Sequence, residues 1–584
     1  MHRVGVDKFW LACHSRSLCD VYLMRPKFNN LVLYSQGSFC VLLPSLPDIA
    51  GATESGEDMK IRLRRACTLL LALAAGTALA AKPLVYCADA TPEGFDPALW
   101  DSASTNNVSS QIFQGLTTFK RGGTEVIPSL ADSWTVSPDG KTITFNLRKD
   151  VRFHTQPYFT PTRPLNADDV VFTVQRWIDP QHLFNKAFSA QFIYPQNLDL
   201  KTQIAGVEKI DQHTVRIRLS APNAVFLSYF AMAFAGIQSA EYADQLLKQG
   251  KASEINNYPI GTGPFKFRSY KKDDSLRLDG NTDFWGNPQK TDKLIFIFAK
   301  EPNVRVQKLK QGECNITSPI RDVDITALEG DSKIVIKKIQ ALNISYLSFN
   351  MKKPPTDNRL VREALDIAVD RDALFKVLFP RGDATQAVSA YPPSMLGYNT
   401  KLKNEYNPER AKELLKKAGF ASGFDIDLWA LPVVRPHNPN GQLMAQMIQQ
   451  DWAKIGVKAS IKTYEWGEYL KRANNGEHSI YMSGWAGDNG DPDDFLAPNL
   501  TCAVNKSGVK FCNKEFDELV EAGRATIDVK KRISHYEKAQ EIFKRERPWI
   551  TIAHSAVYIP MSPDVEGFIM APNGGMDFEN VYRK

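Results

Sequence analysis

The hydrophobic and polar positions of residues 407–473 change their period several times, and each change predicts a new element. Asn407, followed by Pro408, predicts a helix start, and Gly419 predicts its end, with Leu414 and Leu415 on the buried face. The pattern continues with a strand at 424–431, a helix at 442–455, a strand at 457–463 and a helix at 468–473. Alternation of this kind predicts an α/β fold with a largely parallel sheet.

The first half of the chain reads instead as short strands separated by turns. Thr142–Leu147 alternates in the manner of a strand, and Ser137-Pro138-Asp139-Gly140 before it is a turn. Lys82–Cys87 predicts an opening strand, and a helix is expected to run through Ile112. Asn166 can cap a further helix, because two carboxylates follow it in the first turn.

Length and charge limit the kind of protein. At 584 residues the chain is too long for one core, so two or three domains are expected. Hydrophobic content of 43% and charged content of 23% are ordinary for a globular protein in solution. The formal charge of +7 is spread thinly, without a long basic run among aromatics, so nucleic acid is not an expected partner.

Residues 59–81 have the pattern of a secretory signal peptide. A basic start at 60–65 precedes an apolar run at 69–75 and the cleavage pattern Ala78-Leu79-Ala80. The run is too short to span a bilayer, and Cys67 precedes it, so no lipid attachment is expected. The prediction is export as a soluble protein. Residues 1–58 are expected to be upstream sequence from a misassigned start, outside the mature protein and without a stable fold.

Four cysteines follow the cleavage pattern: Cys87, Cys314, Cys502 and Cys512. An even number in an oxidising compartment favours disulfides. A metal site is the alternative, but no Cys-x-x-Cys pair or nearby His supports it.

The stretch from Ser483 to Phe495 is the strongest candidate for a ligand site. It follows an apolar run that resembles a strand end, and its glycines (Gly484, Gly487 and Gly490) allow close approach to the main chain. Trp485 offers a flat apolar wall and Asp488 a carboxylate. The four aspartates at 488, 491, 493 and 494 lack the spacing of a calcium loop. A solvated acidic turn is the remaining alternative.

Several motifs resemble those of the family 5 extracellular solute-binding proteins, the peptide and nickel receptors of ABC importers. They are Leu130-Ala131-Asp132-Ser133-Trp134, Ser137-Pro138-Asp139-Gly140-Lys141, Leu147-Arg148, Leu165-Asn166-Ala167-Asp168-Asp169-Val170-Val171-Phe172, Pro259-Ile260-Gly261-Thr262-Gly263-Pro264-Phe265 and Asn358-Arg359-Leu360-Val361-Arg362-Glu363-Ala364-Leu365. Others resemble the dipeptide-binding members of that family: Leu84-Val85-Tyr86-Cys87, Trp429-Ala430-Leu431-Pro432-Val433, Arg435-Pro436, Tyr464-Glu465-Trp466-Gly467-Glu468-Tyr469-Leu470 and Gly487-Asp488-Asn489-Gly490-Asp491-Pro492-Asp493. The similarity covers residues 82–584.

The resemblance implies a two-lobed periplasmic-binding-protein fold of class C. Lobe I would comprise 82–340 with an extra subdomain near 116–256, lobe II would comprise 341–558, and 559–584 would return to lobe I. The resemblance also implies a disulfide between Cys87 and Cys314. Cys502 and Cys512 are close enough in sequence to form a local clip.

The dipeptide-binding relatives imply roles for individual residues. A free dipeptide is a zwitterion near neutral pH, so a closed pocket must supply one anion and one cation. By motif position Asp488 would bind the amine and Arg435 the carboxylate, for which the planar guanidinium fork is well suited. Trp485 and Gly487 would line the ligand, and Ser102 would contact it from the first lobe.

His437 departs from the dipeptide-binding pattern, which has a phenol at this position. An imidazole changes the hydrogen bonding and can titrate near neutral pH. The same transport role for glutathione, haem or 5-aminolaevulinate is therefore the alternative, with His437 as a possible haem ligand.

Catalysis is not expected from this sequence. It contains no Gly-x-Ser-x-Gly elbow, His-Glu-x-x-His motif or P-loop. The prediction is a monomeric periplasmic receptor, without cofactor or metal, that presents a small peptide to an inner-membrane ABC permease. Besides a receptor and an enzyme, the third possible class of protein is a purely structural protein of the cell envelope, which would bind no ligand.

Overall fold

A computed structural model describes residues 82–100, 102–188, 192–504 and 510–584, together with three strands nearer the N-terminus. The chain divides into two compact units, Met1–Ala80 and Ala81–Lys584. In the first unit, β1 (Asp7–Leu11), β2 (Cys19–Met24) and β3 (Val32–Tyr34) pair as an antiparallel sheet.

These strands lie in a segment for which no stable fold was expected. The rest of residues 1–81 is outside the described part of the chain, and with it the cleavage pattern. The upstream segment at 1–58 and the signal peptide at 59–81 therefore stay predictions.

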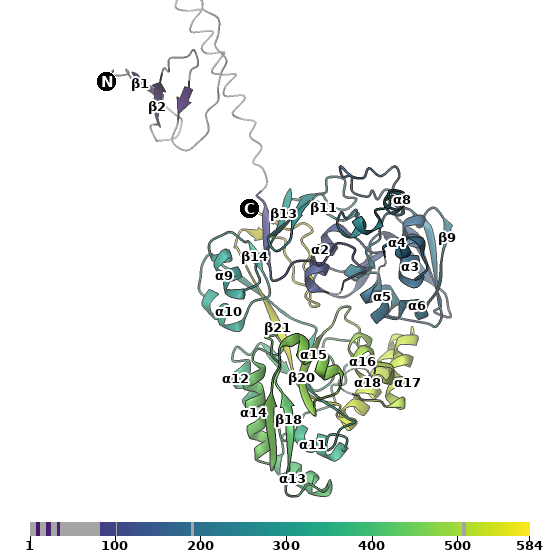
Figure 1. Ribbon diagram of the computed structural model, residues 1–584, viewed down its shortest axis with the longest axis vertical. Helices are drawn as coiled ribbons and strands as arrows, with labels where there is room; N and C mark the ends of the chain where they lie inside the picture. Colours follow the sequence, from purple (N-terminus) through teal and green to yellow (C-terminus); the bar gives the residue numbers. More distant parts are fainter. Residues whose placement is uncertain are drawn as a thin grey trace, which may run out of the picture. The chain divides into compact units, whose positions relative to one another are not determined.

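The second unit is built around a twelve-stranded sheet (Figure 1). Its strands are β4 (Leu84–Ala88), β11 (Phe265–Lys271), β12 (Ser275–Gly280), β13 (Lys293–Phe298), β14 (Ile316–Thr317), β15 (Val335–Gln340), β16 (Asn343–Phe349), β17 (Ala384–Gln386), β18 (Phe424–Trp429), β19 (Val457–Lys462), β20 (Ile480–Ala486) and β21 (Trp549–Met561). The main path runs β11-β12-β13-β4-β14-β21-β16-β20-β18-β19, and β15 and β17 also pair with β21.

Strand β21 belongs to both halves of this sheet (Figure 1). Its last residues pair with β15, and its first residues pair with β16. We call the part built on β4 and β11–β15 lobe I, and the part built on β16–β20 lobe II. The chain passes from one to the other at Ala341 and Leu342, between β15 and β16. The residue boundaries predicted for the lobes stay predictions.

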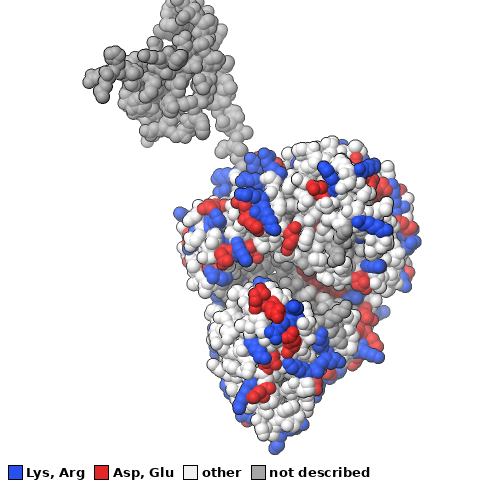
Figure 2. All heavy atoms as spheres, in the orientation of Figure 1, with Lys and Arg blue, Asp and Glu red and all other residues white. Residues whose placement is uncertain are grey.

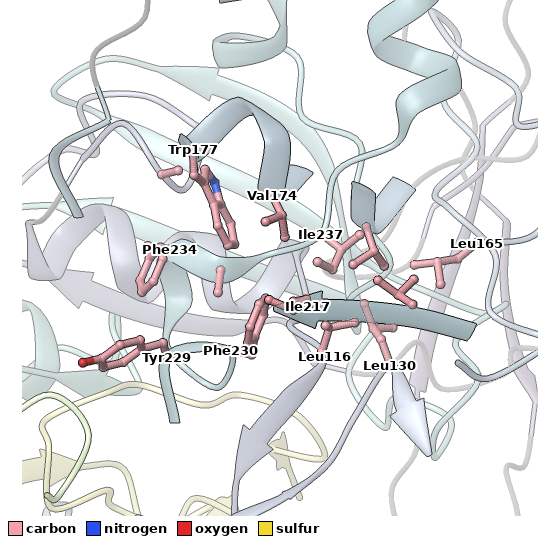
Figure 3. Packing of buried hydrophobic residues seen from close by; sticks show 14 of the residues in the cluster. Leu116, Leu130, Leu165, Val174, Trp177, Ile217, Tyr229, Phe230, Phe234 and Ile237 are labelled. Atoms are coloured by element: carbon pink, nitrogen blue, oxygen red, sulfur yellow. The ribbon is translucent and has the colours of Figure 1, made fainter. Parts of the chain in front are cut away.

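A second sheet, with strand order β7-β8-β10-β9, lies within the region expected to be an extra subdomain. Its strands are β7 (Ala131–Val136), β8 (Thr142–Leu147), β9 (Ile204–Asp211) and β10 (Thr214–Leu219). Helix α3 (Ala167–Ile178) packs with it, and Figure 3 shows Val174 and Trp177 of α3 beside Ile217 of β10 in one apolar cluster. The predicted cap of α3 is confirmed, because Asn166 Oδ1 accepts from Asp168 N at 2.9 Å.

Lobe II contains the α/β alternation that the sequence predicted. Helices α13 (Pro408–Lys417), α14 (Gly441–Ala453) and α15 (Trp466–Asn474) alternate with the strands, one before each of β18, β19 and β20. Strand β18 runs parallel to both β19 and β20. The expectation of a largely parallel sheet is wrong for β16, which is antiparallel to β20 and β21.

The second unit contains further helices of short to medium length. They are α2 (Ala103–Ile112), α9 (Pro302–Lys310), α10 (Asp322–Leu328), α11 (Arg359–Ile367), α12 (Arg371–Leu378), α16 (Asp493–Leu500), α17 (Lys514–Ala525) and α18 (Val529–Glu546). Within the described residues, no helix combines the length and the apolar character needed to cross a membrane.

Both predicted disulfides are confirmed. Cys87 on β4 is joined to Cys314 just before β14, with 5.8 Å between the Cα atoms. Cys502 is joined to Cys512, with a Cα separation of 4.4 Å. The first therefore links two segments of lobe I that neighbour each other in the sheet, and the second closes a local loop in lobe II.

The two disulfides should stabilise the fold unequally. They close loops of 227 and 10 residues. A chain-entropy model gives about 5 kcal/mol for the first and about 3 kcal/mol for the second. Replacing Cys87 and Cys314 together by Ala should lower the free energy of unfolding more than replacing Cys502 and Cys512. Urea unfolding of the two double variants measures this, and equal losses would contradict it.

Candidate ligand-binding site

Arg435 and Asp488 follow two neighbouring strands of lobe II. Strands β18 and β20 are parallel, with Leu428 opposite Ile480, and Arg435 and Asp488 lie in the loops beyond their C-terminal ends. The C-terminal ends of parallel strands meet at one edge of a sheet, where ligand-binding loops commonly lie. The structure therefore brings the predicted anion and the predicted cation to the same edge of one lobe.

The Asp488 loop, residues 487–492, is held by hydrogen bonds of its own main chain. Gly487 N donates to Leu342 O at 2.7 Å, and Asp488 N donates to Asp494 Oδ2 at 2.6 Å. The Asp488 carbonyl accepts from Asn573 Nδ2 at 3.0 Å. Gly490 has a φ of +74°, and a Cβ there would overlap Thr124 of lobe I. The loop thus contacts both lobes.

Two other carboxylates near Asp488 form ion pairs inside lobe II. Asp491 accepts from Arg532 at 2.7 Å, and Asp493 accepts from Arg524 at 3.0 Å. The alternative of a solvated acidic turn is therefore wrong for these two residues. Among the residues that the structure describes, no group of three or more His, Cys, Asp or Glu side chains is arranged to hold a metal ion.

The Asp494 carboxyl lies beside Asp488. Burial, and then the negative charge of Asp488, raise the pKa of Asp494 well above its usual value. Two adjacent negative charges are disfavoured in a poorly solvated place. The Asp488 and Asp494 carboxyl groups together therefore favour one negative charge over two.

Arg435 begins a tight turn that ends at Asn438. Arg435 N donates to Asn438 O at 3.0 Å, and Asn438 N donates back to Arg435 O at 2.9 Å. The side chain is exposed, and its guanidinium lies 5.5 Å from the centre of the Trp466 ring. Although the residue is exposed, nearby protein atoms partly desolvate the guanidinium, which lowers the pKa of Arg435, and the Asp89 carboxylate of lobe I partly offsets this. Arg435 Nη1 donates to the Val434 carbonyl at 3.2 Å. Within residues 82–100, 102–188, 192–504 and 510–584, no salt bridge to Arg435 forms, so its charge is not paired inside the protein.

His437 is turned inward from this turn. Its side chain is buried, and its Nε2 lies where a Cβ of Gly484 on β20 would be. Burial, together with the positive charge of Arg435, lowers the pKa of His437 to about 3. The expectation that His437 titrates near neutral pH is therefore wrong for this conformation, in which the imidazole is neutral. Its role as a ligand-binding residue stays a prediction.

Gly484 should not tolerate a side chain. A Cβ at this position would overlap His437 Nε2 and lie 2.5 Å from the Ile344 carbonyl oxygen of β16. We expect Gly484→Ala to lower the free energy of unfolding by about 2 kcal/mol or more, because a strand backbone cannot move aside. Urea unfolding measures this, with Gly123→Ala as the control, since the atoms nearest to a Cβ there lie 3.8 Å away. Adding His437→Ala to this variant should restore only part of the lost free energy of unfolding, because the overlap with the Ile344 carbonyl remains. Restoration of the full value would contradict an overlap with that carbonyl.

Trp485 lies opposite Ile344 in the pairing of β20 with β16. Its side chain is half-buried and packs against the cluster that contains Phe495 and Leu496. Its buried indole N–H has no hydrogen-bond partner within the described parts of the chain. Trp485 therefore belongs partly to the core, and its contact with a ligand stays a prediction.

Ser102 serves as the N-cap of α2 in lobe I. Its Oγ accepts from Thr105 N at 3.2 Å and donates to Glu93 Oε2 at 2.6 Å. Thr105 Oγ1 donates to the same carboxylate. Ser102 thus fixes the start of α2, and its contact with a ligand backbone also stays a prediction.

Sequence reasoning missed three residues of this region. Asn573 binds the Asp488 carbonyl, and Asp89 of lobe I acts on Arg435 through its charge. Trp466, whose ring faces the Arg435 guanidinium, belongs to a motif that implied no role for it. An Asn before Gly574 and Gly575 predicts only a turn, so no sequence signal indicates a role for Asn573.

Comparison with known proteins identifies the family. Residues 125–507 match the bacterial extracellular solute-binding proteins, family 5. Di/tripeptide-binding protein 1 of Pseudomonas aeruginosa (strain UCBPP-PA14) is 47% identical over 506 residues, which cover 86% of this chain and 94% of that protein. Heme-binding protein A of Haemophilus influenzae is 40% identical over 501 residues, covering 85% and 91%.

A solved structure gives the same result for the fold. The dipeptide binding protein from Pseudoalteromonas sp. SM9913, in complex with Met-Leu, is 34% identical and superposes with a TM-score of 0.76, covering 86% of this chain and all of that one. Structural neighbours of this kind are two-lobed solute-binding proteins, which confirms the two-lobed α/β fold predicted from the sequence. The chain belongs to the family 5 bacterial extracellular solute-binding proteins.

Proposed function

We propose that this protein captures dipeptides in the periplasm and delivers them to an ABC permease of the inner membrane. The observation that carries the proposal is the pair of opposite charges, Asp488 and Arg435, beyond the ends of β20 and β18 at one edge of lobe II. The family and its relatives support the role of receptor, and the protein is proposed to act as a monomer without catalysing a reaction.

The chemistry of the ligand fits this arrangement. A free dipeptide carries an ammonium and a carboxylate at a nearly fixed separation. In the proposed complex Asp488 accepts hydrogen bonds from the ammonium, and Arg435 donates two parallel hydrogen bonds to the carboxylate. Trp485 and Gly487 line the ligand between these ends. Ser102 and the start of α2 approach it from lobe I.

The surface charge supports a small ligand over a polyanion. On the visible face of the second unit, basic and acidic residues lie intermixed and do not gather in one basic patch (Figure 2). A nucleic-acid partner needs a basic stripe or patch. The proposal therefore includes no nucleic acid.

Haem remains a second candidate because of the relative named heme-binding protein A. Axial ligation of haem iron requires an accessible imidazole nitrogen. The burial of His437 against β20 counts against it as that ligand. Dipeptides are therefore preferred over haem.

Native mass spectrometry of the protein purified without refolding tests the proposal directly. The expected result is a mass increase equal to a dipeptide, which disappears after unfolding and refolding in peptide-free buffer. Calorimetry on the refolded protein should then show binding of Met-Leu. Retention of haem, or failure to bind any of a set of dipeptides, would overturn the proposal.

A further inference from the structure

The Asp488 loop is hydrogen-bonded to the point where the chain crosses between the lobes. Gly487 N donates to the carbonyl of Leu342, which lies between β15 and β16. Leu342 N in turn donates to Pro572 O at 2.8 Å. Asn573 follows Pro572 and donates from Nδ2 to the Asp488 carbonyl at 3.0 Å. The loop, the crossover and the C-terminal segment thus form one closed set of hydrogen bonds.

The Asn573 side chain is oriented before it reaches the loop. Its Oδ1 accepts from Gly575 N at 3.2 Å, which leaves Nδ2 facing Asp488. The segment beyond it is fixed to α2 of lobe I: Met576 N donates to Asn107 Oδ1 at 3.1 Å, and Gln111 Nε2 donates to Met576 O at 2.7 Å. Asn573 therefore holds the loop from a segment that is attached to lobe I.

Lobe I contacts the same region of lobe II at two further places. Thr124, between β5 (Thr117–Phe119) and β6 (Val126–Pro128), lies against Gly490. Ala224 N donates to the carbonyl of Arg524 at 2.8 Å, and the Arg524 guanidinium binds Asp493. Rotation of the lobes away from each other would break these contacts and the Asn573 hydrogen bond together.

We propose that Asn573 is a positioning residue for the Asp488 carboxylate, and that it couples recognition of the ligand amine to closure of the lobes. With the lobes together, the Asn573 amide fixes the Asp488 main chain and so the direction of its side chain. With the lobes apart, the loop loses this restraint and binds an ammonium less well. This role rests on the proposed function of Asp488.

A double-mutant cycle tests the role with Met-Leu as the ligand. Asn573→Ala should weaken binding about fivefold, the effect of one lost hydrogen bond. In an Asp488→Asn background the same change should alter affinity by less than about twofold, because coupled residues are not additive. Asn573→Asp keeps the acceptor for Gly575 N and loses the donor, so it should bind as weakly as Asn573→Ala. Asn287→Ala, an exposed Asn in the same lobe, is the matched control and should bind as the wild type does.

Hydrogen exchange tests the same restraint without an affinity measurement. In protein saturated with Met-Leu, which holds the lobes together, Asn573→Ala should make the Gly487 amide exchange about fivefold faster, and Asn287→Ala should leave it unchanged. Equal losses of affinity in the two backgrounds of the cycle, or unchanged exchange at Gly487, would overturn the proposal. If the wild-type protein binds no dipeptide, the proposed function fails, and the role of Asn573 fails with it.

Discussion

Arg435→Ala is expected to weaken the binding of free dipeptides about 100-fold or more. The change removes the cation that faces the ligand carboxylate and leaves that carboxylate unpaired in a closed site. Truncating one member of such a pair costs about 2–5 kcal/mol. Because no salt bridge holds Arg435 within the described parts of the chain, little of the loss should come from a disturbed fold. Calorimetry with Met-Leu measures the affinity, and urea unfolding should show nearly unchanged stability.

Two further variants separate charge from geometry at this position. Arg435→Lys keeps the charge without the planar fork, so its affinity should lie between those of the wild type and the Ala variant. Arg472→Ala is the matched control. This guanidinium also lies over an aromatic ring, 4.2 Å from the centre of Tyr464, but it is paired with Glu477 at 2.7 Å. An Arg435→Ala protein that binds Met-Leu within about threefold of the wild type would contradict the proposed contact.

Dipeptides are expected to bind about 100-fold or more tightly than tripeptides and end-blocked dipeptides. Asp488 and Arg435 belong to the same lobe and follow paired strands, so lobe closure does not set their separation. A third residue extends the peptide by about 3.5 Å, which places one charged end beyond its partner. An unpaired ion in a closed site costs several kcal/mol. Asp488→Asn should likewise weaken binding of free dipeptides strongly, though less than Arg435→Ala.

A ligand series measures both parts of this expectation. Met-Leu, Met-Leu-Leu and N-acetyl-Met-Leu amide can be compared by calorimetry on the wild-type protein and on Asp488→Asn. Asp425→Asn is the control, because Asp425 is an exposed carboxylate on β18 of the same lobe. Equal affinity for the free and the blocked dipeptide would defeat recognition by two charges. Equal affinity for the dipeptide and the tripeptide would show that the separation of the charges does not select length.

Local features of the fold could be predicted because their partners are close in sequence. Asn166 and Asn407 were expected to cap helices, and both side chains accept a main-chain hydrogen bond within three residues. The order of helices and strands in lobe II follows from the change between two periods of apolar positions. The two-lobed arrangement came from the motif resemblance and not from these patterns.

The parts that escaped prediction depend on contacts between distant segments. Asp491 looked solvated, but folding places Arg532 beside it, 41 residues later in the chain. Asn573 reaches Asp488 across 85 residues. His437 was expected to titrate near neutral pH, whereas its imidazole is buried against Gly484 on a neighbouring strand, which lowers its pKa to about 3. A single sequence carries no signal for such pairs.

The position of β16 beside β21 has a consequence for how this architecture can be rearranged. Ser345, near the start of lobe II, pairs directly with Ala553, near its end. Directly paired residues of antiparallel strands have Cα atoms about 5 Å apart. Lobe II is thus a continuous insertion whose two ends meet at one place on lobe I. Recombination at this one place can exchange the whole insertion, together with both charged residues of the site, while the host lobe and its disulfide stay intact.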